Sequence, residues 1–189
     1  MAATATPEST QHGRMRREVI TAGALAMAGI AARPSPGHAE PSAEISRSDE
    51  SIHQERTFRA ALQRVYEALT VEKQFDQIIQ LSGVMKAPEM AKMRKPTLLS
   101  PHVGGAFALF GGYIVGRQLA LVPNELIVQA WRVQSWERGA YSIARFELSD
   151  QGEATKLVFS HTAFPNGKAQ DLASGWQEHY WDPLSKLLA

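Results

Sequence analysis

The stretch that decides the fold runs from Gly104 to Trp136 and reads GGAFALFGGYIVGRQLALVPNELIVQAWRVQSW. It predicts three consecutive strands joined by tight turns, with aromatic rings placed along them. Gly111-Gly112 lies between two apolar runs and can supply the positive φ angles of a two-residue hairpin. Pro123-Asn124 is a second turn signal. A meander of this kind makes a curved antiparallel sheet, and its apolar face needs a cover.

Alternation of apolar and polar residues continues the sheet beyond this stretch. Phe146 and Leu148 fall on one face of their strand, whereas Arg145 and Glu147 fall on the other. One buried face and one wet face are typical of antiparallel sheets. The strands are expected at 104–110, 113–122, 126–134, 140–149 and 155–162.

Along the sequence, helices are expected both before and after the main strands. A short strand over 52–58 precedes two short amphipathic helices, and the second of these is followed by residues 82–101, a long loop or broken helix of the kind that often lines an entrance. The last helix spans 171–188, and Pro183 is expected to kink it or to end its first part. Its apolar stripe consists of Leu172, Trp176, His179, Tyr180, Leu184 and Leu187.

The first 39 residues are expected to be an export signal rather than part of the fold. The pair Arg16-Arg17 resembles a twin-arginine signal, and a short apolar run, VITAGALAMAGIAA, follows it. This run is too short to span a bilayer, and the small residues ending at Ala39 fit a cleavage site. Met15 departs from the usual pattern before the pair, and two alternatives stay open: a disordered alanine-rich tail, or a start codon misplaced upstream of Met15.

The predicted organisation is therefore an export signal over 1–39, a disordered linker over 40–51 and one domain over 52–189. With the signal the protein would be periplasmic or secreted; without it the protein would be cytoplasmic. No stable membrane anchor is expected in either case.

Composition and motifs exclude several classes of function. The chain of 189 residues has 44% hydrophobic residues and a net charge of only +1, so it has no general attraction for nucleic acid. It contains no cysteine, which excludes thiolate chemistry. The glycines do not form a nucleotide-binding loop, and no serine lies in a hydrolase elbow. No histidine or carboxylate cluster has metal-ligand spacing. We therefore expect no cofactor and no metal.

Several motifs resemble one known family. They are the quoted stretch up to Arg132, then YSIARFEL at 141–148, TKLVFSHTAFP at 155–165 and GWQEHYWDPL at 175–184, with VYEALT at 65–70 near the start of the domain. Together these motifs resemble the activator-of-heat-shock-protein-90-ATPase homologues of the START-like (SRPBCC) superfamily. The resemblance implies an α+β helix-grip fold, in which a curved antiparallel sheet wraps around a long C-terminal helix and two short helices follow the first strand.

The resemblance also implies a cavity between the sheet and the C-terminal helix for an apolar or amphipathic ligand. Strand parity places Gln129 on the apolar face beside Trp131, where its amide must find a partner in the protein or the ligand. His161 and His179 also fall on apolar faces, where each is either a satisfied core residue or an acid or base. The candidate cavity residues are Phe107, Phe110, Tyr113, Gln129, Trp131, Tyr141, Phe146, Phe159, His161, Phe164, Trp176, His179 and Tyr180.

Three functions stay open at this point. The favoured one is non-enzymatic binding of a small hydrophobic ligand in the cavity. The family name suggests a chaperone-binding interaction domain instead, although an exported protein would not meet a cytosolic chaperone. A cavity enzyme of the cyclase or hydratase type would need His161, His179 or Tyr180 to point inward beside a carboxylate, and no catalytic residue is assigned.

Overall fold

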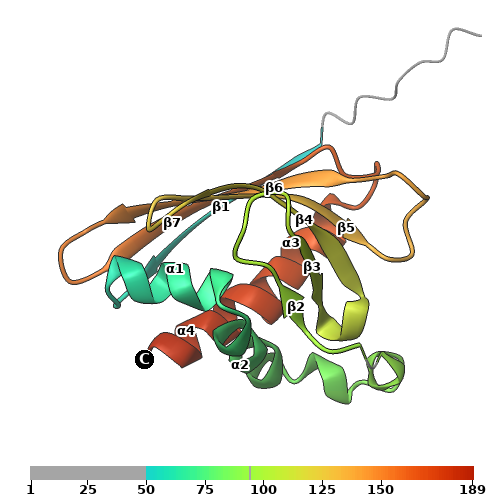
Figure 1. The fold of residues 1–189 in the computed structure, drawn as a ribbon, viewed down its shortest axis with the longest axis horizontal. Helices are drawn as coiled ribbons and strands as arrows, with labels where there is room; N and C mark the ends of the chain where they lie inside the picture. Colours follow the sequence, from blue (N-terminus) through green and yellow to red (C-terminus); the bar gives the residue numbers. More distant parts are fainter. Residues whose placement is uncertain (1–49, 94) are drawn as a thin grey trace, which may run out of the picture. The chain divides into compact units, whose positions relative to one another are not determined.

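The computed structural model describes residues 50–93 and 95–189, and Figure 1 shows their fold. The expected export signal over 1–39 lies outside the described residues, as does the expected linker up to residue 49. The first strand begins at Ser51, one residue before its expected start.

One seven-stranded sheet with the order β1-β7-β6-β5-β4-β3-β2 forms the framework, and every neighbouring pair is antiparallel. The first strand is therefore an edge strand and pairs with the last one, so that Ser51 lies opposite Thr162. The strands are β1 (Ser51–Phe58), β2 (Leu98–Leu99), β3 (Ala106–Leu109), β4 (Ile114–Val122), β5 (Leu126–Val133), β6 (Ser142–Asp150) and β7 (Thr155–Thr162).

The α-helices lie on one side of this sheet, and α3 and α4 run beneath it (Figure 1). This arrangement confirms the α+β helix-grip architecture expected from the sequence. The helices are α1 (Leu62–Thr70), α2 (Glu72–Ser82), α3 (Ala169–Trp176) and α4 (Asp182–Leu188), with short 3-10 helices η1 (Val84–Lys86), η2 (Met90–Lys92) and η3 (Phe110–Gly112) and the π-turn η4 (Gln177–Trp181).

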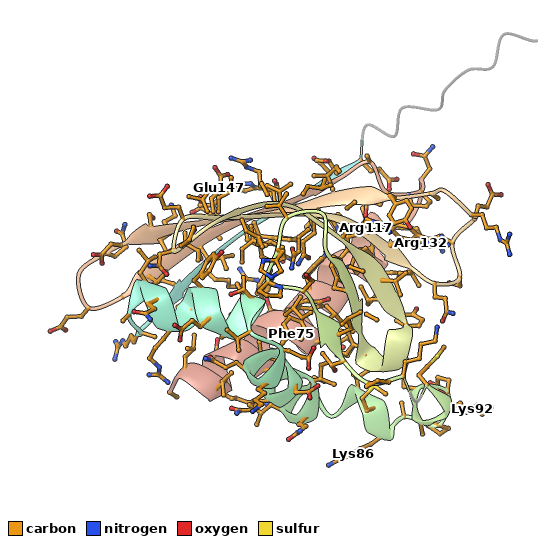
Figure 2. All side chains as sticks on the ribbon, in the orientation of Figure 1. Phe75, Lys86, Lys92, Arg117, Arg132 and Glu147 are labelled. Carbon is orange, nitrogen blue, oxygen red and sulfur yellow. The ribbon has the colours of Figure 1, made fainter. Side chains whose placement is uncertain are left out.

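Strand parity follows the sequence pattern closely. In β5, Ile127, Gln129, Trp131 and Val133 are all buried, and the residues between them are only partly buried. Figure 2 shows Glu147 on the outer side of the sheet and Phe75 on the side where the helices lie. A period of two is enough to predict the inward residues of a strand here, because one face of the sheet is buried and the other faces solvent.

The turn at Gly111-Gly112 is not the expected two-residue hairpin. Leu109 pairs with Ile114, so four residues form the loop, and Phe110, Gly111 and Gly112 have φ angles of 51°, 66° and 88°. A Cβ on Gly111 would lie 2.5 Å from the carbonyl oxygen of Met93. The loop therefore needs glycine both for its backbone conformation and for the close approach of the segment that precedes β2.

Pro183, at which the sequence suggested a kink or an end of the first part of the helix, lies in the first turn of α4, directly after the regular α-winding is interrupted. Residues 177–181 form a π-turn, in which the Asp182 N–H donates to the Gln177 carbonyl. Proline lacks an N–H and its ring conflicts with the carbonyl four residues earlier, and the wider turn gives that carbonyl room. The added residue shifts the apolar stripe, so that Trp181 and Leu188 are buried while His179 and Leu187 are half-buried.

Gly116 in β4 provides the space in which the ring of Phe107 packs. The two residues are cross-strand partners, and a Cβ on Gly116 would lie 2.3 Å from Phe107 Cζ and 2.1 Å from the Ala130 carbonyl oxygen. A glycine inside a strand often marks such a close approach.

Replacing Gly116 with alanine should therefore destabilise the domain. We expect Gly116→Ala to lower the free energy of unfolding by about 1–3 kcal/mol, because the methyl group overpacks a core with a backbone oxygen on one side. Urea denaturation measures this change. Gly175→Ala is the matched control, because its Cβ meets nothing within 4 Å; equal losses in the two variants would contradict the steric explanation.

Candidate functional site

A cavity of about 440 Å³ lies between the sheet and the C-terminal helix. Its walls come from four parts of the chain: the turn before β4, the end of β5 with the turn that follows it, the helical segment 168–180, and the segment 84–90. The cavity therefore lies beside the first part of the C-terminal helix, before the part of the helix that packs directly against the core.

Six of the candidate residues predicted from the sequence line this cavity. Three come from the sheet side and three from the C-terminal helix. They are Phe110, Tyr113 and Trp131, and Trp176, His179 and Tyr180.

Seven of the predicted cavity residues lie elsewhere. Phe107, Phe146, Phe159 and Phe164 are almost fully buried in the core and do not line the cavity. Tyr141 lies on the outer face with 46% of its surface exposed, beneath the guanidinium of Arg132. Gln129 and His161 are buried and bonded to other protein groups.

Gln129 finds its partner in the protein. Its amide donates to Gln118 Oε1, directly across the β4–β5 pair, and Gln118 in turn donates to the Ser100 carbonyl. This polar pair lies on the inner face beside a β-bulge between Gln118 and Ala120. The sequence left open whether the partner of Gln129 belongs to the protein or to a ligand, and the structure shows a partner in the protein.

His161 is a satisfied core residue outside the cavity. Trp176 Nε1 donates to His161 Nδ1 at 3.0 Å, and His161 Nε2 lies 2.7 Å from Ser142 Oγ, whose hydroxyl donates to the Trp131 carbonyl. With its Nδ1 accepting, the ring carries its proton on Nε2 and is neutral. Burial lowers the pKa of His161 to about 3 from its ordinary value of 6.5.

This buried imidazole should make the domain sensitive to acid. In the unfolded chain His161 binds a proton below pH 6.5, whereas in the folded domain it stays neutral down to about pH 3. Protonation therefore favours the unfolded state, and stability should fall by about 1.4 kcal/mol per pH unit between these values.

We expect His161→Gln to remove this contribution while the rest of the pH profile stays. Chemical denaturation of both proteins at a series of pH values gives the difference between their free energies of unfolding. The contribution of the exposed carboxylates is the same in both proteins and drops out of this difference. Parallel profiles for the variant and the wild type would contradict the assignment.

Three polar atoms of residues that line the cavity have no hydrogen-bond partner among residues 50–93 and 95–189. They are Trp131 Nε1, His179 Nδ1 and the Tyr180 hydroxyl, and each is shielded by neighbouring protein atoms. Burial raises the pKa of the Tyr180 hydroxyl, so the phenol is neutral. The neighbouring Trp131 indole acts in the opposite direction and lowers this pKa. Buried polar groups are rarely left unpaired, which makes this trio the most unusual feature of the site.

The π-turn carries two of these three groups. His179 and Tyr180 both belong to it, and Tyr180 packs against Phe75, Phe110 and Trp176 at ring distances of 5.6, 5.4 and 4.1 Å. π-turns inside α-helices are frequent at functional sites.

The charged residues in the described lining of the cavity lie at its rim. Lys168 and Asp171 are both exposed, and Asp171 is the one carboxylate among the lining residues. The deep part of the cavity thus offers an indole, a phenol and an imidazole beside apolar groups. Among the described lining residues, no carboxylate lies beside these three groups.

Sequence reasoning missed much of the remaining wall. Val84 and Met90 come from the segment over 82–101, which has no clear period, and Gly175 has no side chain to attract notice. Trp136 is held in the β5–β6 turn, where Arg132 donates to the carbonyls of Gln134 and Trp136. The other missed lining residues are Ile114, Val133, Ser135, Lys168, Asp171 and Leu172.

Within residues 50–93 and 95–189, no group of three histidine or acidic residues could hold a metal ion. In the same part of the chain, no helix has the length and hydropathy needed to cross a membrane.

A sheet that grips a C-terminal helix, with an aromatic cavity between them, defines a START-like domain. The chain belongs to the family described as Activator of Hsp90 ATPase homolog 1-like protein, whose profile matches residues 59–189.

Comparisons with individual proteins agree with this placement. The chain is 34% identical over 94 residues to an uncharacterized protein of Schizosaccharomyces pombe, covering 50% of this chain and 28% of that protein. It is 28% identical over 91 residues to the human activator of 90 kDa heat shock protein ATPase homolog 1, covering 48% and 27%. The matches thus span little more than a quarter of these relatives.

Solved structures share the fold. A crystal structure of an HSP90 activator from Plasmodium falciparum superimposes with a TM-score of 0.62 at 21% identity, covering 73% of this chain and 95% of that one. CalU16 from Micromonospora echinospora gives a TM-score of 0.57 at 19% identity, covering 74% and 76%.

Proposed function

We propose that this domain binds a small apolar or amphipathic molecule in the cavity between the sheet and the C-terminal helix, without transforming it. The observation that carries the proposal is the cavity of about 440 Å³ with rings on both walls. Ligand sites in proteins are concave, mostly apolar and about this size.

The walls of the cavity support binding because they are rigid. Trp131 contacts Trp136 and Trp176 at ring distances of 5.6 and 5.5 Å, and Phe110 contacts Phe75 at 6.1 Å. Rings held by other rings keep the space open instead of collapsing into it, and a preformed site lowers the cost of binding.

Gly175 offers a direct way to test this function. It lines the cavity from α3, and a Cβ built there meets nothing within 4 Å, so a larger side chain can extend into the cavity. Replacing a helical glycine also removes backbone entropy from the unfolded chain, so stability should not fall.

We expect binding to weaken steadily through the series Gly175→Ala, Gly175→Leu and Gly175→Trp. The loss should reach at least about tenfold for leucine, because the side chain occupies the ligand's space. Titration with N-phenyl-naphthylamine, an uncharged apolar fluorophore, measures the affinity, and thermal unfolding verifies the fold. Undiminished uptake by the tryptophan variant would place the probe elsewhere and remove the basis of the proposal.

A second candidate is a protein-interaction domain that acts on a chaperone. The family match and the name of the human relative favour it. Such a role needs the domain and the cytosolic chaperone to share a compartment. The location of the protein therefore separates the two candidates.

We propose export as the location, on the evidence of the twin-arginine pattern at Arg16-Arg17. In a full-length tagged chain, replacing both arginines with lysine should move the protein from the periplasmic to the cytoplasmic fraction, because this export route reads the arginine pair and not the charge alone. Cell fractionation and immunoblotting measure the distribution.

The matched control keeps the pair and replaces Arg14 and Arg33 with lysine, which should leave export unchanged. Finding the unaltered chain in the cytoplasm would exclude export and favour the chaperone candidate.

A further inference from the structure

Trp131 and Tyr180 each have a polar group at the cavity without a hydrogen-bond partner in the described part of the chain, although both side chains are almost fully buried. Their exposed fractions are 3% and 5%. Leaving such a group without a partner costs about 1–3 kcal/mol, and that cost is removed when a ligand supplies the partner.

Neither ring can turn away to find a partner in the protein. Trp131 packs against Trp136, His161 and Trp176, at ring distances of 5.6, 5.0 and 5.5 Å. Tyr180 is held at 4.1 Å from the same Trp176 ring, so one side chain positions both groups. The indole N–H and the phenol O–H are therefore fixed near each other.

The chemistry of the two groups restricts what they can bind. An indole N–H only donates, whereas a neutral phenol donates one hydrogen bond and can also accept. Burial keeps the Tyr180 phenol protonated. Two neighbouring donors are satisfied by one oxygen with two lone pairs. His179 Nδ1, from the same π-turn, adds a contact that donates or accepts according to its tautomer.

Charge decides between a neutral oxygen and an anionic one. Among residues 50–93 and 95–189, the cavity lining contains one lysine, Lys168, which is exposed at the rim, and no arginine. A carboxylate placed deep in the cavity would remain uncompensated at a high desolvation cost. A carbonyl oxygen avoids that cost and still accepts two hydrogen bonds.

We propose that the ligand carries an uncharged carbonyl group, as a ketone, ester or amide does, whose oxygen accepts hydrogen bonds from Trp131 Nε1 and the Tyr180 hydroxyl. The remainder of the ligand is apolar and lies against Ile114, Val133 and Leu172. This inference rests on the proposed function and specifies the class of its ligand.

Two probes that differ at one group test the inference on the full domain: methyl naphthyl ketone and ethylnaphthalene. Competition with N-phenyl-naphthylamine gives the affinity of each. We expect the wild type to prefer the ketone by about threefold to tenfold, the range that hydrogen bonds contribute. Tyr180→Phe removes only the hydroxyl and should reduce this preference by a similar factor without weakening the binding of ethylnaphthalene, which cannot pair with the hydroxyl.

Tyr141→Phe is the matched control, because it deletes the same hydroxyl from an exposed ring outside the cavity and should keep the preference. The infrared carbonyl stretch of the bound ketone gives a second readout. It should lie at lower frequency in the wild type than in Tyr180→Phe, since the bond to the phenol is lost.

The outcomes separate this inference from the proposed function. Equal affinities for the two probes, or a ketone stretch that is the same in Tyr180→Phe, would overturn the carbonyl assignment and leave apolar binding in place. Uptake of the fluorophore without displacement by either probe also counts against the assignment. Failure of all three compounds to bind would overturn both.

Discussion

The hydrogen bond from Trp176 Nε1 to His161 Nδ1 holds the C-terminal helix on the sheet. It begins a chain that continues through the Ser142 hydroxyl to the Trp131 carbonyl, and so joins α3 to β7, β6 and β5. All of these groups are buried among aromatic rings, where water cannot replace a broken bond. The chain fixes the rotation of the helix, and with it the side chains that face the cavity.

The sequence predicts which face of each strand is buried, because a period of two has only two outcomes. Trp131, Phe146 and Phe159 all lie on the side that alternation assigns to them. The helix is harder to predict, because a period of 3.6 assumes regular winding. The π-turn adds one residue before Pro183, and Trp181, which the regular pattern leaves out of the stripe, is buried instead.

The cavity itself could be predicted only in part. Phe159 and Trp131 share parity and chemistry, yet Phe159 packs directly on Trp176, with ring centroids 4.4 Å apart, while Trp131 reaches the cavity. Alternation gives the face of a residue but not the distance between the helix and the sheet at that point. Met90 contributes to the wall from a segment without periodicity, so no local pattern could have indicated it. The unpaired phenol of Tyr180 also depends on neighbours that only the folded chain brings together.

The pairing of β1 with β7 has a consequence for how the chain becomes a domain during synthesis. β1 is made first but must wait for its partner strand, which at ribosomal rates takes roughly 5–20 s. An unpaired strand with apolar side chains invites association with other chains during such a delay. Gln54 and Arg56 interrupt the inward face of β1, so the waiting strand is less adhesive than its apolar ends suggest. In the folded domain both side chains bind the C-terminal helix. Gln54 accepts a hydrogen bond from the Trp181 indole and donates one to the Ala173 carbonyl, and Arg56 donates one to the Gln177 side chain. The polar side chains that reduce association of the nascent strand are therefore the same ones that bind the C-terminal helix in the folded domain.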